Sequence, residues 1–178
     1  MNDPAFRLFQ RESTRPLSHD SVGVAVNIPV GTAPIKILAA DLNNDGNLDL
    51  VVASLGTRGT INGGLAVMLG NGTFRATVNI LNGVAVSRIA LGDIDRDGIL
   101  DLAAAIENPQ FTFNFAFLPG NGDGTFKAAV NLPATPYRYS GVGATAIVEF
   151  DGDGFRDILV ASSAESSLII FPGNGEVP

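Results

Sequence analysis

Three short loops of the sequence carry oxygen-bearing side chains at a spacing that suits a metal ion. In each loop these side chains stand at positions 1, 3, 5 and 9, and a glycine stands at position 6. Alternate residues of a tight loop can converge on one point, the glycine permits the sharp turn, and the backbone carbonyl of position 7 can add a ligand. The candidate ligands at positions 1, 3, 5, 7 and 9 are Asp41, Asn43, Asp45, Asn47 and Asp49 in loop 1 (residues 41–49), Asp93, Asp95, Asp97, Ile99 and Asp101 in loop 2 (residues 93–101), and Glu149, Asp151, Asp153, Phe155 and Asp157 in loop 3 (residues 149–157).

The number and kind of these ligands favour calcium. Ca²⁺ accepts about six to eight oxygen ligands, whereas Mg²⁺ demands a stricter octahedron. The loops hold three, four and four of the chain's 18 acidic residues, and carboxylates packed so densely repel one another unless a cation joins them. We therefore expect up to three Ca²⁺ ions. Loop 3 is the weaker candidate because Glu149 is longer than an aspartate, and Asn43 lowers the ligand charge of loop 1.

A single copy of such a loop would also be compatible with a plain turn, because Asp and Gly both favour turn conformations. Three copies in register favour the metal site over a plain turn. An EF-hand is disfavoured because position 12 lacks the bidentate Glu of that motif, the residues there being Val52, Ala104 and Val160, and because the flanking segments have the composition of strands.

The loops belong to an internal repeat. Loop 2 begins 52 residues after loop 1, and loop 3 begins 56 residues after loop 2. A second marker follows each loop as LGNGTF from Leu69, PGNGDGTF from Pro119 and PGNG from Pro172. A third marker places Asn27, Asn79 and Asn131 52 residues apart. Three independent markers with one period indicate a repeat architecture.

The segments between the markers predict short β-strands, since they are rich in Val, Ile, Leu and Ala and are bounded by Gly, Asn, Asp and Pro. Four short antiparallel strands per repeat of this length are typical of a β-propeller blade, so we expect an all-β chain of three blades. The expected strands are Ile35–Ala40, Leu48–Ser54, Leu65–Leu69 and Ala76–Ile80 in the first repeat, Ser87–Gly92, Leu100–Ile106, Phe113–Leu118 and Ala128–Leu132 in the second, and Ala144–Glu149, Asp157–Ser162 and Leu168–Phe171 in the third.

The strand order raises the question of ring closure. A strand of the fourth type, Val22–Ile28, precedes the first repeat, while the third repeat stops at PGNGEVP before making its own. Residues 22–178 supply three complete blades if this leading strand completes the third, and residues 1–21 remain unassigned. Known propellers have roughly four to eight blades. Either two chains share a six-bladed ring as a homodimer, or the chain is an excerpt from a longer propeller, and the sequence leaves both alternatives open.

The motifs place the chain beside a known family. With DLNNDGNLDL and DIDRDGILDL followed by LGNGTF and LPGNGDGTF, the sequence resembles the FG-GAP/VCBS repeats of bacterial surface and secreted proteins, and it is similar to the calcium-bearing blades of integrin alpha-subunit propellers. The resemblance covers about Val22 to the end. It implies a propeller with calcium on one rim, secreted or at the cell surface, that often serves adhesion or ligand binding and is sometimes part of a polysaccharide-active enzyme.

Composition excludes several classes of function. A formal net charge of -7 argues against nucleic acid and anionic membranes as partners. The absence of Cys removes disulfides and thiolate metal sites, and a single His leaves little for a Ser-His-Asp relay. No apolar run approaches the roughly 18 residues of a membrane span, and residues 1–20 lack a hydrophobic signal-peptide core. We therefore expect no membrane insertion.

Two aromatic segments are candidate surfaces. Phe111, Phe113, Phe115 and Phe117 alternate along one strand and so share a face of it. Because the aligned positions of the other repeats are also apolar, we expect Phe115 and Phe117 to pack between blades, whereas Phe111 and Phe113 would suit a protein interface if they are exposed.

The second segment consists of Tyr137, Arg138 and Tyr139, which stand in a Pro-rich linker. They are a weak candidate for stacking against a sugar or a peptide, and a solvated loop is the simpler alternative. The absence of Trp weakens the case for a lectin.

Three functions remain, in this order. The first is a non-enzymatic, calcium-binding module for extracellular recognition or adhesion of a protein or carbohydrate ligand, because the acids are accounted for by the loops. The second is a calcium-dependent hydrolase or lyase that acts on polysaccharide at the propeller mouth. The acids left for it, Asp20, Glu107 and Asp123, show no pairing in the sequence. The third is a structural repeat fragment of a larger surface protein.

Overall fold

The structure is a computed structural model that describes residues 25, 27–57, 62–71, 78–107, 113–132, 142–163 and 166–175. In this part of the chain all regular secondary structure is β-strand, arranged as antiparallel sheets of three and four strands. The expected all-β fold of successive blades is therefore confirmed. The described residues contain no helix with the length and apolar character needed to cross a bilayer.

Each sheet is a meander of consecutive strands. The first sheet has the order β1-β2-β3-β4, the second β5-β6-β7-β8 and the third β9-β10-β11. Every neighbouring pair is antiparallel, and β7 and β10 have the predicted bounds. The strands are β1 (Pro34–Ala40), β2 (Asp49–Ser54), β3 (Gly64–Met68), β4 (Val78–Ile80), β5 (Ala85–Gly92), β6 (Asp101–Glu107), β7 (Phe113–Leu118), β8 (Val130–Leu132), β9 (Val142–Val148), β10 (Asp157–Ser162) and β11 (Ser167–Phe171).

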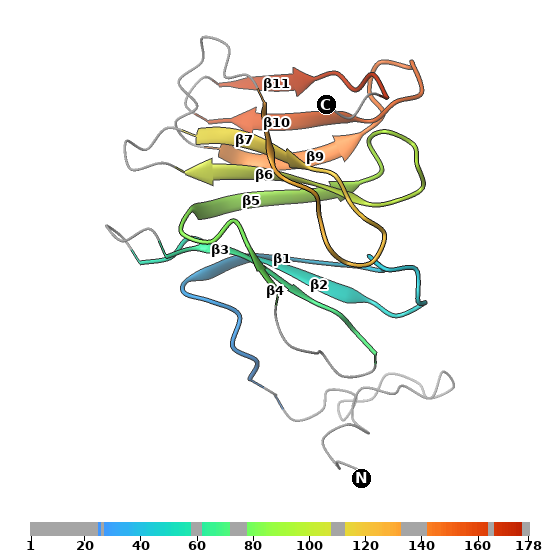
Figure 1. Cartoon of the computed structure of the whole chain (residues 1–178). Helices are drawn as coiled ribbons and strands as arrows, with labels where there is room; N and C mark the ends of the chain where they lie inside the picture. The colour runs from blue at the N-terminus through green and yellow to red at the C-terminus, as the bar shows by residue number, and fades with distance from the viewer. Residues whose placement is uncertain are drawn as a thin grey trace, which may run out of the picture.

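The sheets stack face to face in chain order, with the first sheet at one end of the stack and the third sheet at the other (Figure 1). Between the first and second sheets, Leu65 and Val67 of β3 pack in one core with Leu102 of β6. Between the second and third sheets, Phe115 and Phe117 of β7 pack in another core. Strands with a neighbouring sheet on both faces need near-continuous apolar runs, which explains why these segments show little polar alternation.

The aromatic strand β7 lies between two blades, as its sequence pattern predicted. Phe115 and Phe117 are 1% and 4% exposed, and the ring of Phe115 lies 5.7 Å from that of Phe171 in the third sheet. The packing role predicted for these two residues is confirmed. Phe111 lies outside the described residues, as does the side chain of Phe113.

Small residues allow the inner strands of neighbouring sheets to approach closely. At Gly92, the last residue of β5, an added Cβ would lie 2.4 Å from Cγ2 of Ile147 in β9. Ala103, Ala104 and Ala105 of β6 are almost fully buried between the sheets on either side. Small side chains of β5 and β6 therefore let neighbouring sheets pack closely.

The leading strand expected at 22–28 is not formed in the described part of that segment. Ala25, Asn27 and Ile28 are outside any strand, and Asn27, Ile28 and Val30 instead lie against the first sheet. The third sheet, at the other end of the stack (Figure 1), has three strands among the described residues. The condition for three complete blades, that this segment completes the third, is not met within one chain, because the length of the stack separates the two.

Candidate metal loops

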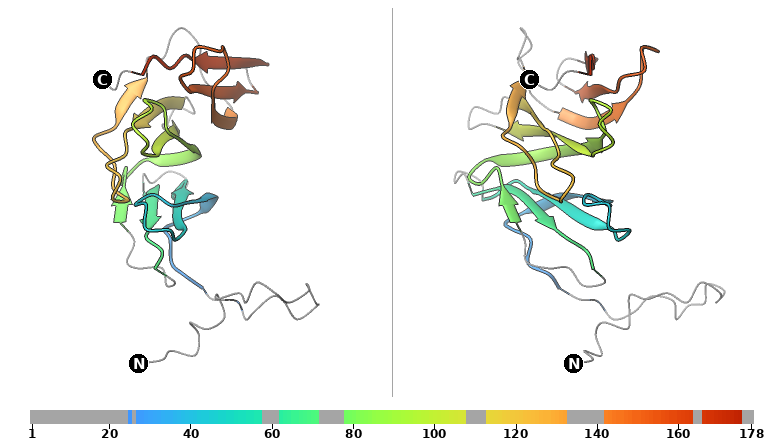
Figure 2. Two further views of the ribbon diagram at one scale, coloured as in Figure 1. Left: turned by 90° about the vertical axis from the view of Figure 1, so that its right-hand side faces the viewer. Right: turned by 45° about the vertical axis from the view of Figure 1, so that its right-hand side comes forward.

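Loops 1, 2 and 3 lie along the same edge of the stack (Figures 1 and 2). Each loop joins the first strand of its sheet to the second, as β1 to β2, β5 to β6 and β9 to β10. Because the sheets are repeats stacked in the same orientation, equivalent loops fall at equivalent places. The result is a row of acidic loops along one rim.

The backbone of each loop turns through two left-handed residues. Position 6 is Gly46, Gly98 or Gly154, with φ of 84°, 84° and 87°. This conformation favours glycine, so the role predicted for position 6 is confirmed. Position 4 is also left-handed in every copy. It is occupied by Asn44 (φ 56°), Arg96 (φ 64°) and Gly152 (φ 88°).

The side chains at positions 3 and 5 point back to the loop backbone in the same way in all three copies. The side-chain oxygen of position 3 accepts the N–H of position 5 at 3.1 Å in each loop. Oδ1 of position 5 accepts the N–H of position 7 at 2.7–2.8 Å. In loop 1 the N–H of Asn47 is the main cause that lowers the pKa of Asp45 below its usual value. Each turn therefore gathers its side-chain oxygens around its own backbone.

Position 1 distinguishes loop 3 from the other two. Asp41 and Asp93 each accept the N–H of the position 6 glycine, at 2.9 and 3.2 Å. Glu149 instead accepts the N–H of Gly152 at position 4. The extra methylene of Glu149 carries its carboxylate to a different donor, in keeping with the expectation that loop 3 departs from the pattern.

The aspartate at position 9 is a buried clamp. Asp49, Asp101 and Asp157 are at most 1% exposed. In each copy Oδ2 accepts the N–H of position 2 at 2.8–2.9 Å. Oδ1 accepts the N–H of the first glycine of the GNG marker at 2.7–2.9 Å. Besides being a candidate ligand, this side chain thus ties the start of the loop to the turn after the third strand, a role that the sequence did not reveal.

The glycines that the clamp holds have no room for a side chain. A Cβ at Gly70, Gly120 or Gly173 would lie 2.1, 2.4 or 2.2 Å from the backbone carbonyl oxygen of position 8 in its own blade. Contacts shorter than 3 Å with backbone cannot be relieved by a side-chain movement. This close approach explains why the GNG marker recurs with the period of the loops.

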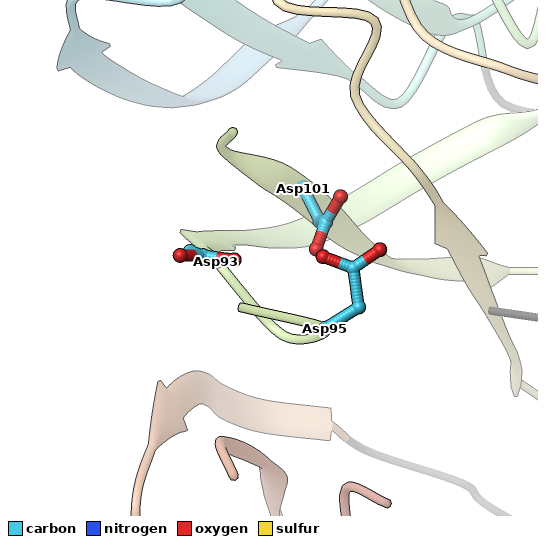
Figure 3. A group of neighbouring side chains, drawn as sticks. All are labelled: Asp93, Asp95 and Asp101. Carbon is cyan, nitrogen blue, oxygen red and sulfur yellow. The ribbon is translucent and has the colours of Figure 1, made fainter. Parts of the chain in front are cut away.

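Loop 2 contains the strongest candidate metal site. Carboxylate oxygens of Asp93, Asp95 and Asp101 lie within 4.8 Å of one another, with Asp93 at the end of β5 and Asp101 at the start of β6 (Figure 3). Oδ1 of Asp93 is buried and accepts no hydrogen bond. Buried polar atoms normally have partners, and a cation between these carboxylates would supply one. The residues present therefore fit a hard, oxygen-bound ion such as Ca²⁺.

The negative charge of loop 2 also raises the free energy of this loop when no cation is bound. Burial raises the pKa of Asp101 above its usual value, and the charges of Asp95 and Asp97 raise it further. The N–H groups of Gly120 and Ile94 oppose this shift only in part. A divalent ion would stabilise the ionised form of Asp101.

Loops 1 and 3 offer less complete sites. In loop 3, carboxylate oxygens of Glu149, Asp151 and Asp153 lie within 4.8 Å of one another, but all three residues are exposed. In loop 1, Nδ2 of Asn43 donates to Oδ2 of Asp45 at 3.1 Å, so the amide already relieves part of the negative charge that a cation would otherwise neutralise. We rank loop 2 first as a metal site on these contacts.

The rim is continuous from loop 2 to loop 3. The guanidinium carbon of Arg96 lies 5.6 Å from the centroid of the Phe155 ring, within the range of a cation–π contact. The repeat pattern does not indicate this pair, since Arg96 stands where the other loops have Asn44 and Gly152. The contact lies between two sheets, and only the stacking of the blades brings the two residues together.

The remaining candidates add no second site to the described residues. Tyr137, Arg138 and Tyr139 lie outside the described part of the chain, so their ligand-binding role stays a prediction. Asp123 accepts the N–H of Thr125 at 2.9 Å, and the hydroxyl and N–H of Thr125 lower the pKa of Asp123. Asp123 is therefore a turn residue of the GNGDGT marker.

Comparison with known proteins agrees with the motifs. Residues 41–104 match the family model described as an FG-GAP-like repeat, a segment that runs from the start of loop 1 through loop 2 into β6. No curated protein matches the chain. The resemblance seen in the motifs is therefore confirmed over residues 41–104, which are similar to an FG-GAP-like repeat.

Proposed function

We propose that this chain is a calcium-binding β-propeller module that serves extracellular recognition or adhesion and catalyses no reaction. The observation that carries the calcium part is the buried, unpartnered Oδ1 of Asp93 beside the carboxylates of Asp95 and Asp101. Ca²⁺ would neutralise these carboxylates and hold the loop in one conformation. In each loop the side chains at positions 1, 3, 5 and 9 and the carbonyl at position 7 would hold the ion.

The recognition part is supported by the position of the loops. The loops form one row on one rim (Figure 2), and Arg96 links loop 2 to loop 3 through Phe155. Loops held by ions on a rigid scaffold are a common setting for ligand binding. Calcium sites of extracellular modules have affinities of roughly 10⁻⁴–10⁻³ M, matched to extracellular calcium, which suits exposed loops such as loops 1 and 3. The ligand would be a protein or a carbohydrate.

Thermal unfolding with calcium and with a chelator tests the metal site. An ion that binds only the folded loops stabilises the fold by RT ln(1 + [Ca²⁺]/Kd), about 2.7 kcal/mol per site at 100 times Kd. We expect a higher Tm in CaCl₂ than in EGTA, and a smaller difference for the variant Asp93→Asn. Asp123→Asn is the matched control, because it removes one carboxylate outside the loops. Equal Tm values in calcium and in EGTA would refute the calcium part.

Binding and hydrolysis assays test the recognition part. Screens against glycans and surface proteins are run in CaCl₂ and in EGTA, and we expect binding that calcium strengthens. Parallel assays of polysaccharide cleavage should show no turnover. Calcium-dependent cleavage would contradict a non-catalytic module and support the enzymatic alternative.

A further inference from the structure

The chain buries the same kind of sheet-to-sheet interface twice. We define the forward face of a sheet as the face that the first sheet turns to the second and the second turns to the third, and the backward face as the opposite one. Val51, Leu65 and Val67 lie on the forward face of the first sheet. Ala103, Phe115 and Phe117 occupy the same register positions in the second sheet. Two faces of the stack, one at each end, remain outside these interfaces.

The forward face of the third sheet is apolar and exposed. By strand register, Leu168 occupies the position of Leu65 and Phe115, which are each 1% exposed, but Leu168 is 52% exposed. Phe150, at position 2 of loop 3, is 56% exposed, whereas its counterparts in loops 1 and 2 are 4% and 9% exposed. The positions that bury side chains in the first and second sheets therefore keep apolar residues in the third, where no sheet of the described residues covers them.

The backward face of the first sheet is its counterpart. Ile37 pairs with Val52 as Ile89 pairs with Ala104, yet Ile37 is 56% exposed and Ile89 is 2% exposed. Ile35 is 42% exposed. The same face carries a groove of about 400 Å³ lined by residues of β1, β2 and β3 and by Asn27, Ile28 and Val30. The first sheet therefore exposes a backward face and the third sheet exposes a forward face. These are the two halves of the interface that the chain forms twice.

The outer edge of β11, which pairs with no strand in the described part of the chain, points to the same partner. Asn79 and Asn131 lie on β4 and β8, the outer strands of the first and second sheets. They pair with Ala66 of β3 and Ala116 of β7. Each of these fourth strands leads directly into the first strand of the next sheet. Asn27 is the third member of this series and leads into β1. By the same pattern, Asn27 and Ile28 would form the fourth strand of a sheet that precedes the first one, beside the third strand of that sheet.

We propose that a second copy of this chain docks head to tail, with the backward face of its first sheet on the forward face of the third sheet. Its Asn27 and Ile28 then lie beside Ile169 and Leu168 of β11, in the register of β4 on β3. A second contact of the same kind closes the pair with two-fold symmetry. Six sheets fall within the roughly four to eight blades of closed propellers, whereas three and nine fall outside. The contact continues an interface that the chain already forms twice, and it does not depend on calcium.

Molar mass by light scattering tests this dimer in calcium and in EGTA. We expect twice 18.4 kDa for the unaltered chain. Leu168→Asp and Ile37→Asp should each give the monomer mass. Each variant places a carboxylate on one side of both contacts of the dimer. Both side chains are exposed in the single chain, so circular dichroism should show an unchanged fold. Val78→Asp is the matched control and should remain a dimer, since Val78 is 49% exposed and pairs with Val67 on the forward face of the first sheet, which is not an end face of the stack.

Mixing the two monomeric variants tests the direction of the contact. One junction of the mixed pair joins the two altered faces, and the other joins two unaltered faces, so a heterodimer should reappear. A monomer for the unaltered chain would overturn the proposal, as expected if further blades of a longer polypeptide cover the ends. A dimer that persists in Ile37→Asp would indicate contact between two third sheets, and a mass that grows with concentration beyond two copies would indicate an open chain. Either result also overturns it.

Discussion

The clamp aspartate at position 9 yields a prediction that separates its role in the fold from its role as a ligand. Asp49 is 0% exposed, and its two carboxylate oxygens accept the N–H groups of Leu42 and Gly70 at 2.8 and 2.7 Å. Asp49→Ala leaves both buried N–H groups without an acceptor. Each unsatisfied buried donor costs about 1–3 kcal/mol, so we expect a loss of about 2–6 kcal/mol in the free energy of unfolding.

Urea denaturation in EGTA is the assay, because no calcium then contributes to stability. The isosteric Asp49→Asn keeps one acceptor oxygen but turns an NH₂ group toward the other N–H, so its loss should be about half as large. Asp45→Asn is the control. Because Asp45 is exposed, this variant should lose much less of its free energy of unfolding in EGTA. If Asp49→Ala were as stable as the unaltered chain in EGTA and weakened only in CaCl₂, the clamp would have no structural role.

Three further predictions concern the packing and one turn. Gly120→Ala forces a Cβ to within 2.4 Å of the Leu100 carbonyl oxygen and should destabilise the fold by about 1–3 kcal/mol in urea denaturation; an unchanged midpoint would contradict the close approach. Phe115→Ala empties the core between the second and third sheets and should cost about 3–5 kcal/mol, and a loss below about 1 kcal/mol would mean that these sheets are not packed. Asp123→Asn should lower Tm more at pH 7 than at an acidic pH below the pKa values of Asp123. The lowered pKa of Asp123 means that its contribution is present above the unfolded-state pKa and disappears as the pH falls through the folded-state pKa; an equal effect at both pH values would count against the Thr125 contact.

The sequence predicted the strands and loops well because the repeat shows each element more than once. The bounds of β7 and β10 agree with prediction, since Asp at position 9 and the GNG marker delimit the second and third strands of each repeat. The turn geometry of the loops also followed from local composition, as the left-handed Gly46 shows. Features fixed by neighbouring residues were therefore predictable.

Features that depend on contacts distant in the chain were not predictable. Gly70 lies 21 residues from Asp49, and the alternating acids gave no sign that this one is a clamp. Arg96 and Phe155 meet only across two sheets. The strand expected at 22–28, which is not formed in its described part, has the same origin, because strand-like composition does not show which strand a segment can pair with.

Equilibrium dialysis against CaCl₂ up to millimolar concentration tests the central claim most directly, by counting the ions that each chain binds. We predict saturable binding of two or three Ca²⁺ per chain, with one fewer for a variant that carries both Asp93→Asn and Asp95→Asn, because the unpartnered oxygen of Asp93 and its neighbour form the site in loop 2. No saturable binding, or the same stoichiometry in that variant, would contradict the assignment of the loops as calcium sites.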